Sequence, residues 1–266
     1  MLVNIAHLVL EIKGGLKENY IRTWQQFENN NITHKDCILI VPKCNYVEYS
    51  LESIQIEKDF KAAQFYKYNK SFMTVDFKWE RAYVFDNGDK ASWSIFANQI
   101  FYTHAVQRHM IQIHSSMIEY SGNGLLFLGP SGIGKTTMAE LWNKYRGALI
   151  INGDMNFVQE TDECFLGWGT PWHGSSPYCE NTSVPVKALI VLKQAPENSI
   201  RELKDFEKVQ LVSNNIIYPT WLENGMELCL ETLNHLLSAL PVYELSCRPD
   251  EEAVWLTEEA VFGGSV

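Results

Sequence analysis

The sequence reads Gly129-Pro130-Ser131-Gly132-Ile133-Gly134-Lys135-Thr136-Thr137 directly after the apolar run Leu125-Leu126-Phe127-Leu128. This order fits the pattern G-x-x-x-x-G-K-[ST], a glycine-rich loop between a strand and a helix that binds the phosphates of a nucleotide. The glycines let backbone N–H groups turn toward the phosphates, the lysine supplies a positive charge, and the following hydroxyl can bind Mg²⁺. The stretch therefore predicts a nucleoside triphosphate site formed by Gly129, Ser131, Gly132, Ile133, Gly134, Lys135, Thr136 and Thr137.

The sequence around this loop alternates between strand and helix patterns. A strand is expected at residues 110–120, with Ser121-Gly122-Asn123-Gly124 as its turn. The helix that begins at Lys135 presents one apolar face and ends at Gly147, a residue typical of helix C-termini. Beyond it we expect strands at 148–151, 188–192 and 242–245 and a helix at 226–240. The strand at 148–151 should lie beside the strand that precedes the loop. This order predicts an α/β fold, or α+β for the chain as a whole.

The chain divides by pattern into a β-rich N-terminal region at 1–103 and the loop-containing domain at 104–266. In the first region, apolar and polar residues alternate over 3–12 and over 72–77, as in half-buried strands. Residues 37–41, Cys-Ile-Leu-Ile-Val, form a short apolar run before a proline. Short strands with polar breaks are therefore expected throughout this region.

One further signal in the N-terminal region predicts a hairpin. Asp86-Asn87-Gly88-Asp89 separates residues 82–85 from residues 92–95, and Asn-Gly favours a two-residue turn between strands. No catalytic constellation appears here, and the aromatic residues are better explained as core and cross-strand pairs than as a ligand cage.

Composition limits the classes of function. The 266 residues are 46% hydrophobic and 20% charged, typical of a globular protein that can bury a core. The net charge of −10 and the lack of a basic run argue against nucleic acid as a partner. The chain shows neither a signal peptide nor an apolar stretch of about 18 residues, so we expect a cytoplasmic protein without membrane association. The six cysteines form no C-x-x-C pair, so no zinc site or disulfide framework is indicated. The oligomeric state is left open.

Three segments outside the loop carry groups suited to chemistry. Asp154 follows the expected strand at 148–151, where a carboxylate can hold Mg²⁺ beside the phosphates or simply close a turn. His114 lies in the strand before the loop, as a core histidine or as a ligand or catalytic group. Residues 169–178 mix glycine, proline, hydroxyls and an aromatic, which suits either a mobile loop over a substrate or a surface turn. Polar groups that could assist lie farther along the chain, at Asn198, Arg201 and Arg248.

Taken in order, five segments resemble the catalytic domain of bacterial HPr serine kinase/phosphorylase and its smaller relatives, a phosphoenolpyruvate-carboxykinase-like branch of P-loop proteins. The resemblance covers about residues 104–256, and its specificity lies in the ordered set. Some of these relatives are peptide-tailoring kinases that phosphorylate a serine of a ribosomal peptide precursor. The segments are His-Ser-Ser (114–116), Gly-x-x-Phe-Leu-Gly-Pro-Ser-Gly-Ile-Gly-Lys-Thr-Thr (124–137), Arg-Gly-Ala-Leu-Ile-Ile-Asn-Gly-Asp (146–154), Gly-Thr-Pro-Trp-His-Gly-Ser (169–175) and Cys-Arg-Pro-Asp-Glu-Glu-Ala-Val (247–254).

The resemblance implies a P-loop kinase core that uses ATP and Mg²⁺. It makes Lys135 the phosphate-binding lysine, Thr136 and Asp154 the metal ligands, and Asp154, His114 and Lys135 the catalytic residues. The family typically carries two adjacent aspartates after this strand, and here the first of them is Gly153. Only Asp154 remains, to serve as the base, as a metal ligand or as both. No segment matches the family stretch linked to the reverse reaction, so phosphorylase activity is not expected.

These observations predict a kinase that transfers the γ-phosphoryl group of ATP to a hydroxyl, most readily a serine in a peptide or protein. Two alternatives stay open: a small-molecule kinase on the same scaffold, and a nucleotide-dependent switch that hydrolyses ATP slowly. The carboxykinase reaction itself is not expected, because the sequence shows no cluster of basic and metal-binding residues suited to oxaloacetate. The sequence does not identify the acceptor or distinguish ATP from GTP.

Overall fold

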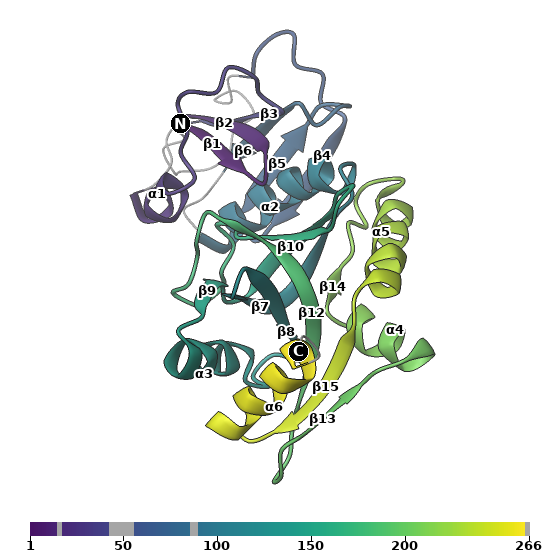
Figure 1. Cartoon of the computed structure of the whole chain (residues 1–266). Helices are drawn as coiled ribbons and strands as arrows, with labels where there is room; N and C mark the ends of the chain where they lie inside the picture. The colour runs from purple at the N-terminus through teal and green to yellow at the C-terminus, as the bar shows by residue number, and fades with distance from the viewer. Residues whose placement is uncertain (15–17, 43–55, 86–89, 264–266) are drawn as a thin grey trace. The chain divides into compact units, whose positions relative to one another are not determined.

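The computed structural model describes residues 1–14, 18–42, 56–85 and 90–263. They form a mixed α/β protein with two compact units, Met1–Ala105 and Val106–Val266, each built around one β-sheet (Figure 1).

The N-terminal unit contains a six-stranded sheet with the order β1-β2-β3-β6-β5-β4. The alternating stretch at 3–12 forms two antiparallel strands, because Ala6 and His7 adopt the left-handed conformation, with φ of 49° and 62°, and turn the chain. The elements are β1 (Leu2–Ile5), β2 (Leu8–Gly14), α1 (Glu18–Gln25), β3 (Cys37–Val41), β4 (Gln64–Tyr68), β5 (Ser71–Val75), β6 (Arg81–Phe85) and α2 (Lys90–Val106).

The predicted second strand of the hairpin, at residues 92–95, is wrong. These residues belong to α2, and the turn at 86–89 lies outside the described residues. The buried side chains of this helix recur at helical spacing: Trp93, Phe96, Ala97, Ile100 and Phe101 are each at most 2% exposed. A helical period over 17 residues outweighs a four-residue alternation, because the longer period places one continuous stripe of apolar side chains in the core.

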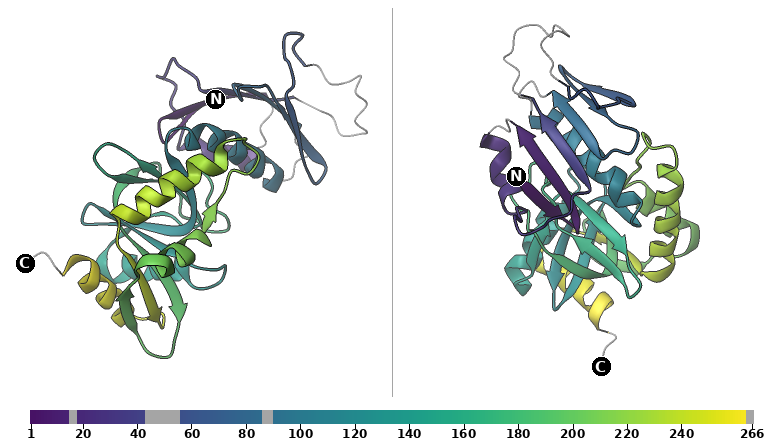
Figure 2. Two further views of the ribbon diagram at one scale, coloured as in Figure 1. Left: turned by 90° about the vertical axis from the view of Figure 1, so that its right-hand side faces the viewer. Right: turned by 90° about the horizontal axis from the view of Figure 1, so that it is seen from above.

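The C-terminal unit contains a nine-stranded sheet in the order β11-β10-β7-β8-β12-β15-β13, with β9 and β14 paired to β7. Helices α3 and α5 lie on opposite sides of its strands (Figures 1 and 2). The strands are β7 (Met110–Tyr120), β8 (Asn123–Leu128), β9 (Leu149–Asn152), β10 (Met155–Glu160), β11 (Phe165–Trp168), β12 (Ser183–Gln194), β13 (Ser199–Glu202), β14 (Ile216–Ile217) and β15 (Val242–Cys247). The helices are α3 (Lys135–Arg146), α4 (Asp205–Ser213), α5 (Gly225–Ala239) and α6 (Glu251–Phe262).

The strand expected at 148–151 forms as β9, but not beside β8. It pairs antiparallel with β7, so β7 lies between β8 and β9. The parallel partner of β8 is β12, which in turn pairs in parallel with β15. The prediction failed because it assumed that two strands joined by a helix are neighbours, whereas the hairpin strand β7 already occupies that edge of β8.

Strand β7 changes its neighbours near its middle. Along one edge, β8 pairs with residues 115–120 and β14 with 112–113. Along the other edge, β9 pairs with 117–119 and β10 with 110–114. Residues 129–134 follow β8, and residues 153–154 follow β9. Both segments therefore begin beside the same part of β7, near residues 115–117.

A single apolar cluster fixes α3 and α6 to the sheet. It contains Phe127 of β8, Met138 and Trp142 of α3, Ile190 of β12 and Val254 of α6, among other buried residues. Trp142 is fully buried, and truncating such a side chain to alanine costs about 3–5 kcal/mol of stability. The helix that follows the loop is therefore held rigidly. In the part of the chain that the structure describes, no helix has the length and apolarity needed to cross a bilayer.

Candidate functional site

The glycine loop, residues 129–134, joins the end of β8 to the start of α3. Gly129, Gly132 and Gly134 have φ of 141°, 80° and 113°, a region that residues with a Cβ rarely adopt. Gly134 is the N-cap of α3, and no described side chain caps this helix end. The N-terminal N–H groups of α3 are thus available to an anion, which the helix dipole also favours.

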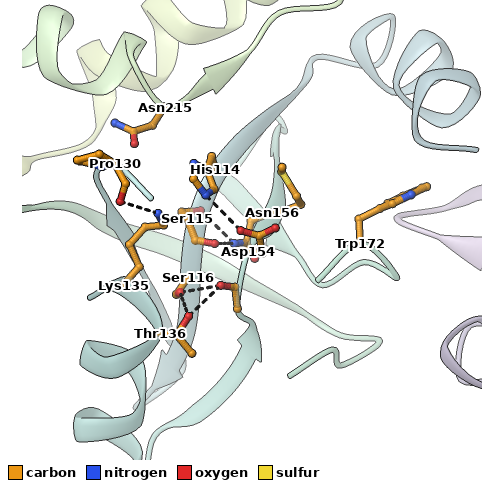
Figure 3. Close-up of polar contacts among 12 residues, drawn as sticks. His114, Ser115, Ser116, Pro130, Lys135, Thr136, Asp154, Asn156, Trp172 and Asn215 are labelled. Atoms are coloured by element: carbon orange, nitrogen blue, oxygen red, sulfur yellow. Dashed lines mark hydrogen bonds and ion pairs between the residues drawn. The ribbon is translucent and has the colours of Figure 1, made fainter. Parts of the chain in front are cut away.

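Lys135, the first residue of α3, is only 7% exposed. Its Nζ donates to the carbonyl oxygens of Gly129, at 2.9 Å, and Pro130, at 3.3 Å, and so folds back over the loop (Figure 3). Burial lowers the pKa of Lys135, and the negative charge of Asp154 opposes that shift. A phosphate in the loop would offer this lysine the anionic partner that its two carbonyl contacts do not provide.

Asp154 and His114 form a close pair from neighbouring strands. The Nε2 atom of His114 lies 3.2 Å from Oδ1 of Asp154, and both side chains are about one quarter exposed, at 26% and 28% (Figure 3). Register explains the contact, since His114 is opposite Met155 in the β7–β10 ladder. The backbone oxygen of Asp154 also accepts a hydrogen bond of 2.9 Å from the N–H of Ser115. The contact with His114 and the backbone hydrogen bond therefore hold Asp154 in place, while about one quarter of its side chain stays open to solvent.

Hydroxyl groups connect this pair to α3. The Oγ of Ser116 donates to the carbonyl oxygen of Gly153 at 2.9 Å and lies 3.4 Å from Oγ1 of Thr136. Thr136 Oγ1 in turn lies 3.3 Å from the same carbonyl oxygen (Figure 3). The structure thus brings Lys135, Thr136, His114 and Asp154 around one short stretch of β7.

The segment 169–178 is anchored rather than a surface turn. Gly169, Thr170, Pro171 and Trp172 are buried. The side chain of Asn152, which is fully buried, donates to the carbonyl oxygens of Thr170, at 2.9 Å, and Trp172, at 3.1 Å. The part that reaches the site is Gly174, where an added Cβ would lie 2.3 Å from Oδ2 of Asp154. Gly174 therefore borders the carboxylate.

Two asparagines in the site were not predicted. Asn152 accepts from the backbone N–H of Asp154 at 2.9 Å and from that of Met155 at 3.1 Å, and so shapes the turn that presents the carboxylate. Its place beside Gly153 and Asp154 was a usable sequence signal.

Asn215 is the second unpredicted residue and follows α4. Its Oδ1 accepts a 2.9 Å hydrogen bond from the N–H of Gly129, and its backbone oxygen accepts from the N–H of His114 at 2.8 Å. It is 6% exposed. No local pattern marks it, because its partners lie far away in the sequence.

Among the other polar candidates, Arg248 lines a pocket beside the glycine loop, together with Gly132, Ile133 and Gly134. Arg201 pairs with Glu207 and Glu244. Arg248 pairs with Asp250 and Glu252, and the side-chain oxygen of Asn198 accepts from the backbone N–H of Arg248. These ion pairs occupy both guanidinium groups, so neither one is directed at Asp154.

The donor set fits Mg²⁺ bound jointly with a nucleotide. The described residues contain no cluster of three or more His, Cys, Asp or Glu side chains that could hold a metal alone. Mg²⁺ instead favours one or two protein oxygens together with phosphate oxygens and water. The Thr136 hydroxyl, which contacts the Gly153 carbonyl oxygen, and the carboxylate of the next residue, Asp154, are such a set.

The fold and the site define a mixed α/β protein with a glycine-rich strand–loop–helix segment beside a carboxylate–histidine pair. The chain belongs to the family described as SynChlorMet cassette protein ScmC, which matches residues 92–247, more than half of its length.

It is also distantly related to the HPr kinase/phosphorylase of Mycoplasmopsis pulmonis (strain UAB CTIP), at 29% identity over 111 residues. That match covers 37% of this chain and 33% of the relative, so the chain spans about a third of the length of this curated protein. Among solved structures, the Hpr(Ser) kinase/phosphatase from Coxiella burnetii is similar with a TM-score of 0.35 and 12% identity, over 57% of this chain and 89% of that one.

Proposed function

We propose that this protein is a kinase that uses ATP and Mg²⁺ and transfers the γ-phosphoryl group to a hydroxyl, that of a serine in a peptide or protein. One observation carries the proposal: the glycine loop with Lys135 and Thr136, and the pair Asp154–His114, border the same residues of β7. Phosphoryl transfer needs this combination, a cradle for the phosphates next to a group that orients the attacking hydroxyl. The distant relation to HPr kinase/phosphorylase supports it.

The glycine loop and Lys135 bind the nucleotide in this proposal. The N–H groups at the start of α3 bind the phosphates, and Lys135 exchanges its two carbonyl contacts for a phosphate oxygen. Thr136 and Asp154 would hold Mg²⁺, which when bound neutralises charge on the phosphates.

Asp154 acts on the acceptor. It accepts a hydrogen bond from the attacking hydroxyl and takes its proton as the oxygen bonds to the γ-phosphorus, while the bond from that phosphorus to the β-phosphate oxygen breaks. The products are a phosphate monoester and ADP. His114, 3.2 Å from Asp154, keeps one carboxylate oxygen in place so that the other faces the acceptor.

The acceptor approaches past residues 173–175. Gly174 borders the carboxylate, and Gly174 and Ser175 are exposed, so an extended peptide can bring a serine hydroxyl to Asp154 without opening the core. A peptide or protein acceptor also agrees with the resemblance to peptide-tailoring kinases drawn from the ordered motifs.

The test is transfer of label from γ-labelled ATP with Mg²⁺ into an extract of the native cell, resolved by size. Lys135→Ala and Asp154→Asn are the site variants, and Lys144→Ala and Asp162→Asn, both at exposed positions, are their matched controls. We expect label in a peptide or protein, retained in the controls, lost in Lys135→Ala and reduced about 10²–10⁴-fold in Asp154→Asn.

Other outcomes would contradict the proposal in distinct ways. Label confined to a small molecule would indicate a small-molecule kinase. Label released only as free phosphate would indicate a nucleotide-dependent switch. Transfer that continues unchanged in Asp154→Asn would remove this carboxylate from the mechanism.

A further inference from the structure

The six-stranded sheet of the N-terminal unit has two edges, and they differ. Residues 27–29 cover the edge strand β1. The N–H of Asn4 donates to the carbonyl oxygen of Phe27 at 2.8 Å, and Val3 forms an antiparallel bridge with Glu28. The other edge strand is β4, and its one partner among the described strands is β5 (Figure 1). The β4 edge therefore offers backbone groups with which a further strand can pair.

The turn after β4 determines which backbone groups face outward. Tyr68 and Ser71 are partners across a two-residue turn, in which Asn69 is left-handed with φ of 52°. In such a hairpin the residues that flank the turn are hydrogen-bonded to each other, and this bonding alternates along the strand. Phe65 and Lys67 therefore direct their backbone N–H and C=O groups away from β5.

The same two residues carry exposed side chains, on one face of β4. The side chain of Phe65 is 71% exposed, and that of Lys67 is exposed as well. On the opposite face, the ring of Tyr66 packs against Trp79 with the ring centroids 5.5 Å apart, which holds the strand in place. An edge lysine discourages pairing with another strand, whereas an exposed edge phenylalanine promotes it. Together the two side chains indicate a selective contact surface.

The sequence around β4 is basic, although the chain as a whole is acidic. Residues 58–78 contain five lysines and two aspartates, whereas the net charge of the chain is −10. The two aspartates, Asp59 and Asp76, contact Arg81 at 3.0 and 3.9 Å. With the described residues, neither Lys61 nor Lys67 forms an ion pair. This edge therefore carries positive charge that a partner can neutralise.

Charge decides between two possible occupants of the edge. A second copy of the chain, paired through β4, would bring two basic stretches together. An acidic segment in an extended conformation would instead place a carboxylate opposite Lys67. Opposite charges across a strand pair are stabilising and like charges are destabilising, so Lys67 favours the acidic segment over self-pairing.

We propose that β4 is a docking edge, to which an extended acidic segment of a partner protein adds as a further strand. A carboxylate of the partner lies opposite Lys67, and an apolar side chain lies opposite Phe65. Main-chain hydrogen bonds supply the affinity, and these two side chains supply the selectivity. The surface belongs to the N-terminal unit alone, so the inference does not depend on the proposed phosphoryl transfer.

The probe is the synthetic peptide Glu-Thr-Val-Thr-Glu-Thr-Val-Thr-Glu, labelled with fluorescein. Its anisotropy is measured as the full chain is added. The sequence reads the same in both directions, so either strand direction can place the central glutamate opposite Lys67 and a valine opposite Phe65. One comparison peptide has lysine in place of each glutamate. The other is N-methylated at the central glutamate and at both valines, and so keeps every side chain but loses those backbone donors.

We expect the acidic peptide to bind about tenfold or more tightly than either comparison peptide, because it alone combines negative charge with free backbone donors. Equal binding of the N-methylated peptide would overturn the proposal, since charge attraction without strand pairing would then explain the affinity. Failure of the acidic peptide to bind would overturn it as well.

Charge reversal on the protein tests the role of Lys67. Lys67→Glu should weaken the acidic peptide by about fivefold or more and strengthen the basic peptide by a similar factor. Lys204→Glu, at an exposed position in the C-terminal unit, is the matched control and should change neither affinity. Unchanged affinities in Lys67→Glu would overturn the proposal.

The apolar contact is tested in the same way. Phe65→Ala should weaken the acidic peptide by about threefold or more, because an aromatic side chain no longer packs across the added strand. Phe206→Ala removes a phenylalanine that is 75% exposed on α4 and is the matched control. Equal affinities in the two variants would show that the peptide does not lie along β4.

Sedimentation of the full chain tests the other occupant. We expect Phe65→Ala and Lys67→Glu to leave the sedimentation coefficient unchanged. If the chain instead dimerises and these two variants alter the dimer, the occupant of the β4 edge is a second copy, which would overturn the proposal of an acidic partner.

Discussion

The side chain of Ser176 occupies the space that a side chain at Gly153 would need. An ideal Cβ on Gly153 would lie 1.9 Å from Oγ and 2.4 Å from Cβ of Ser176, which is 9% exposed and held by its neighbours. Residue 153 stands next to Asp154, where the resemblance to HPr serine kinase/phosphorylase implies a second carboxylate. The packing of this chain thus favours one carboxylate at the site.

We expect Gly153→Ala to lower the free energy of unfolding by about 1–3 kcal/mol, because Ser176 must move out of a packed position. The double variant with Ser176→Gly should recover part of this loss. Urea denaturation of the two single variants and the double variant measures the coupling. Additive losses would show that the two side chains do not compete for one space.

Gly174 limits where the Asp154 carboxylate can lie. Gly174→Ala should reduce phosphotransfer through kcat more than through the KM for ATP, because its Cβ would meet Oδ2 of Asp154 at 2.3 Å. Gly122→Ala is the matched control, since its φ of 74° is also left-handed but its Cβ would meet no described atom within 4 Å. Both variants should lose about 1 kcal/mol of stability from backbone strain, and only Gly174→Ala should lose activity. If the two variants had equal activity, Gly174 would have no effect on the position of the Asp154 carboxylate.

Asn215 should act as a positioning residue for the glycine loop. Asn215→Leu keeps a similar volume but leaves the N–H of Gly129 without its acceptor, which costs about 1–3 kcal/mol. We expect weaker ADP binding in calorimetry together with lower stability, whereas Asn214→Leu, exposed and adjacent, changes neither. A loss of stability with unchanged ADP affinity would assign Asn215 a purely structural role.

Glu258 joins α6 to the rest of the C-terminal unit. It accepts from Tyr120 Oη at 2.7 Å and from Arg146 Nε at 2.5 Å. Burial opposes its ionisation, but hydrogen bonds from Arg146 and Tyr120 outweigh burial and hold the pKa of Glu258 below its ordinary value.

A lowered carboxyl pKa gives stability that is complete above the unfolded-state pKa and is lost as pH falls through the folded-state pKa. We therefore expect Glu258→Gln to be about 1 kcal/mol less stable than the parent at pH 7, with the difference closing below about pH 4. Glu259→Gln, exposed on the same helix, is the control. Urea titrations at both pH values check this, and a difference that persists at low pH would point to packing instead of charge.

The sequence predicted the parts of the fold that depend on local order. Strand β8, the glycine loop and α3 follow each other within a few residues, and Asp154 follows the next strand, so their patterns could be recognised directly. The proximity of His114 to Asp154 was not predictable, because it depends on the register between β7 and β10. Asn215 was missed for the same reason. It precedes the two-residue strand β14, and the pairing of β14 with β7 brings it to the glycine loop. The roles of all these residues remain predictions until the variants are measured.

Strand β7 has a consequence for how this site can be regulated. Its 11 residues are hydrogen-bonded to four other strands, and His114, Ser115 and Ser116 lie at their centre. Those residues can move only if the middle of the sheet opens locally, which takes a large share of the global unfolding free energy. Their amide protons should accordingly be among the slowest to exchange with solvent. An effector that changes the activity of this protein must therefore act at the glycine loop or at residues 173–175, while His114, Ser115 and Ser116 keep their positions in the sheet.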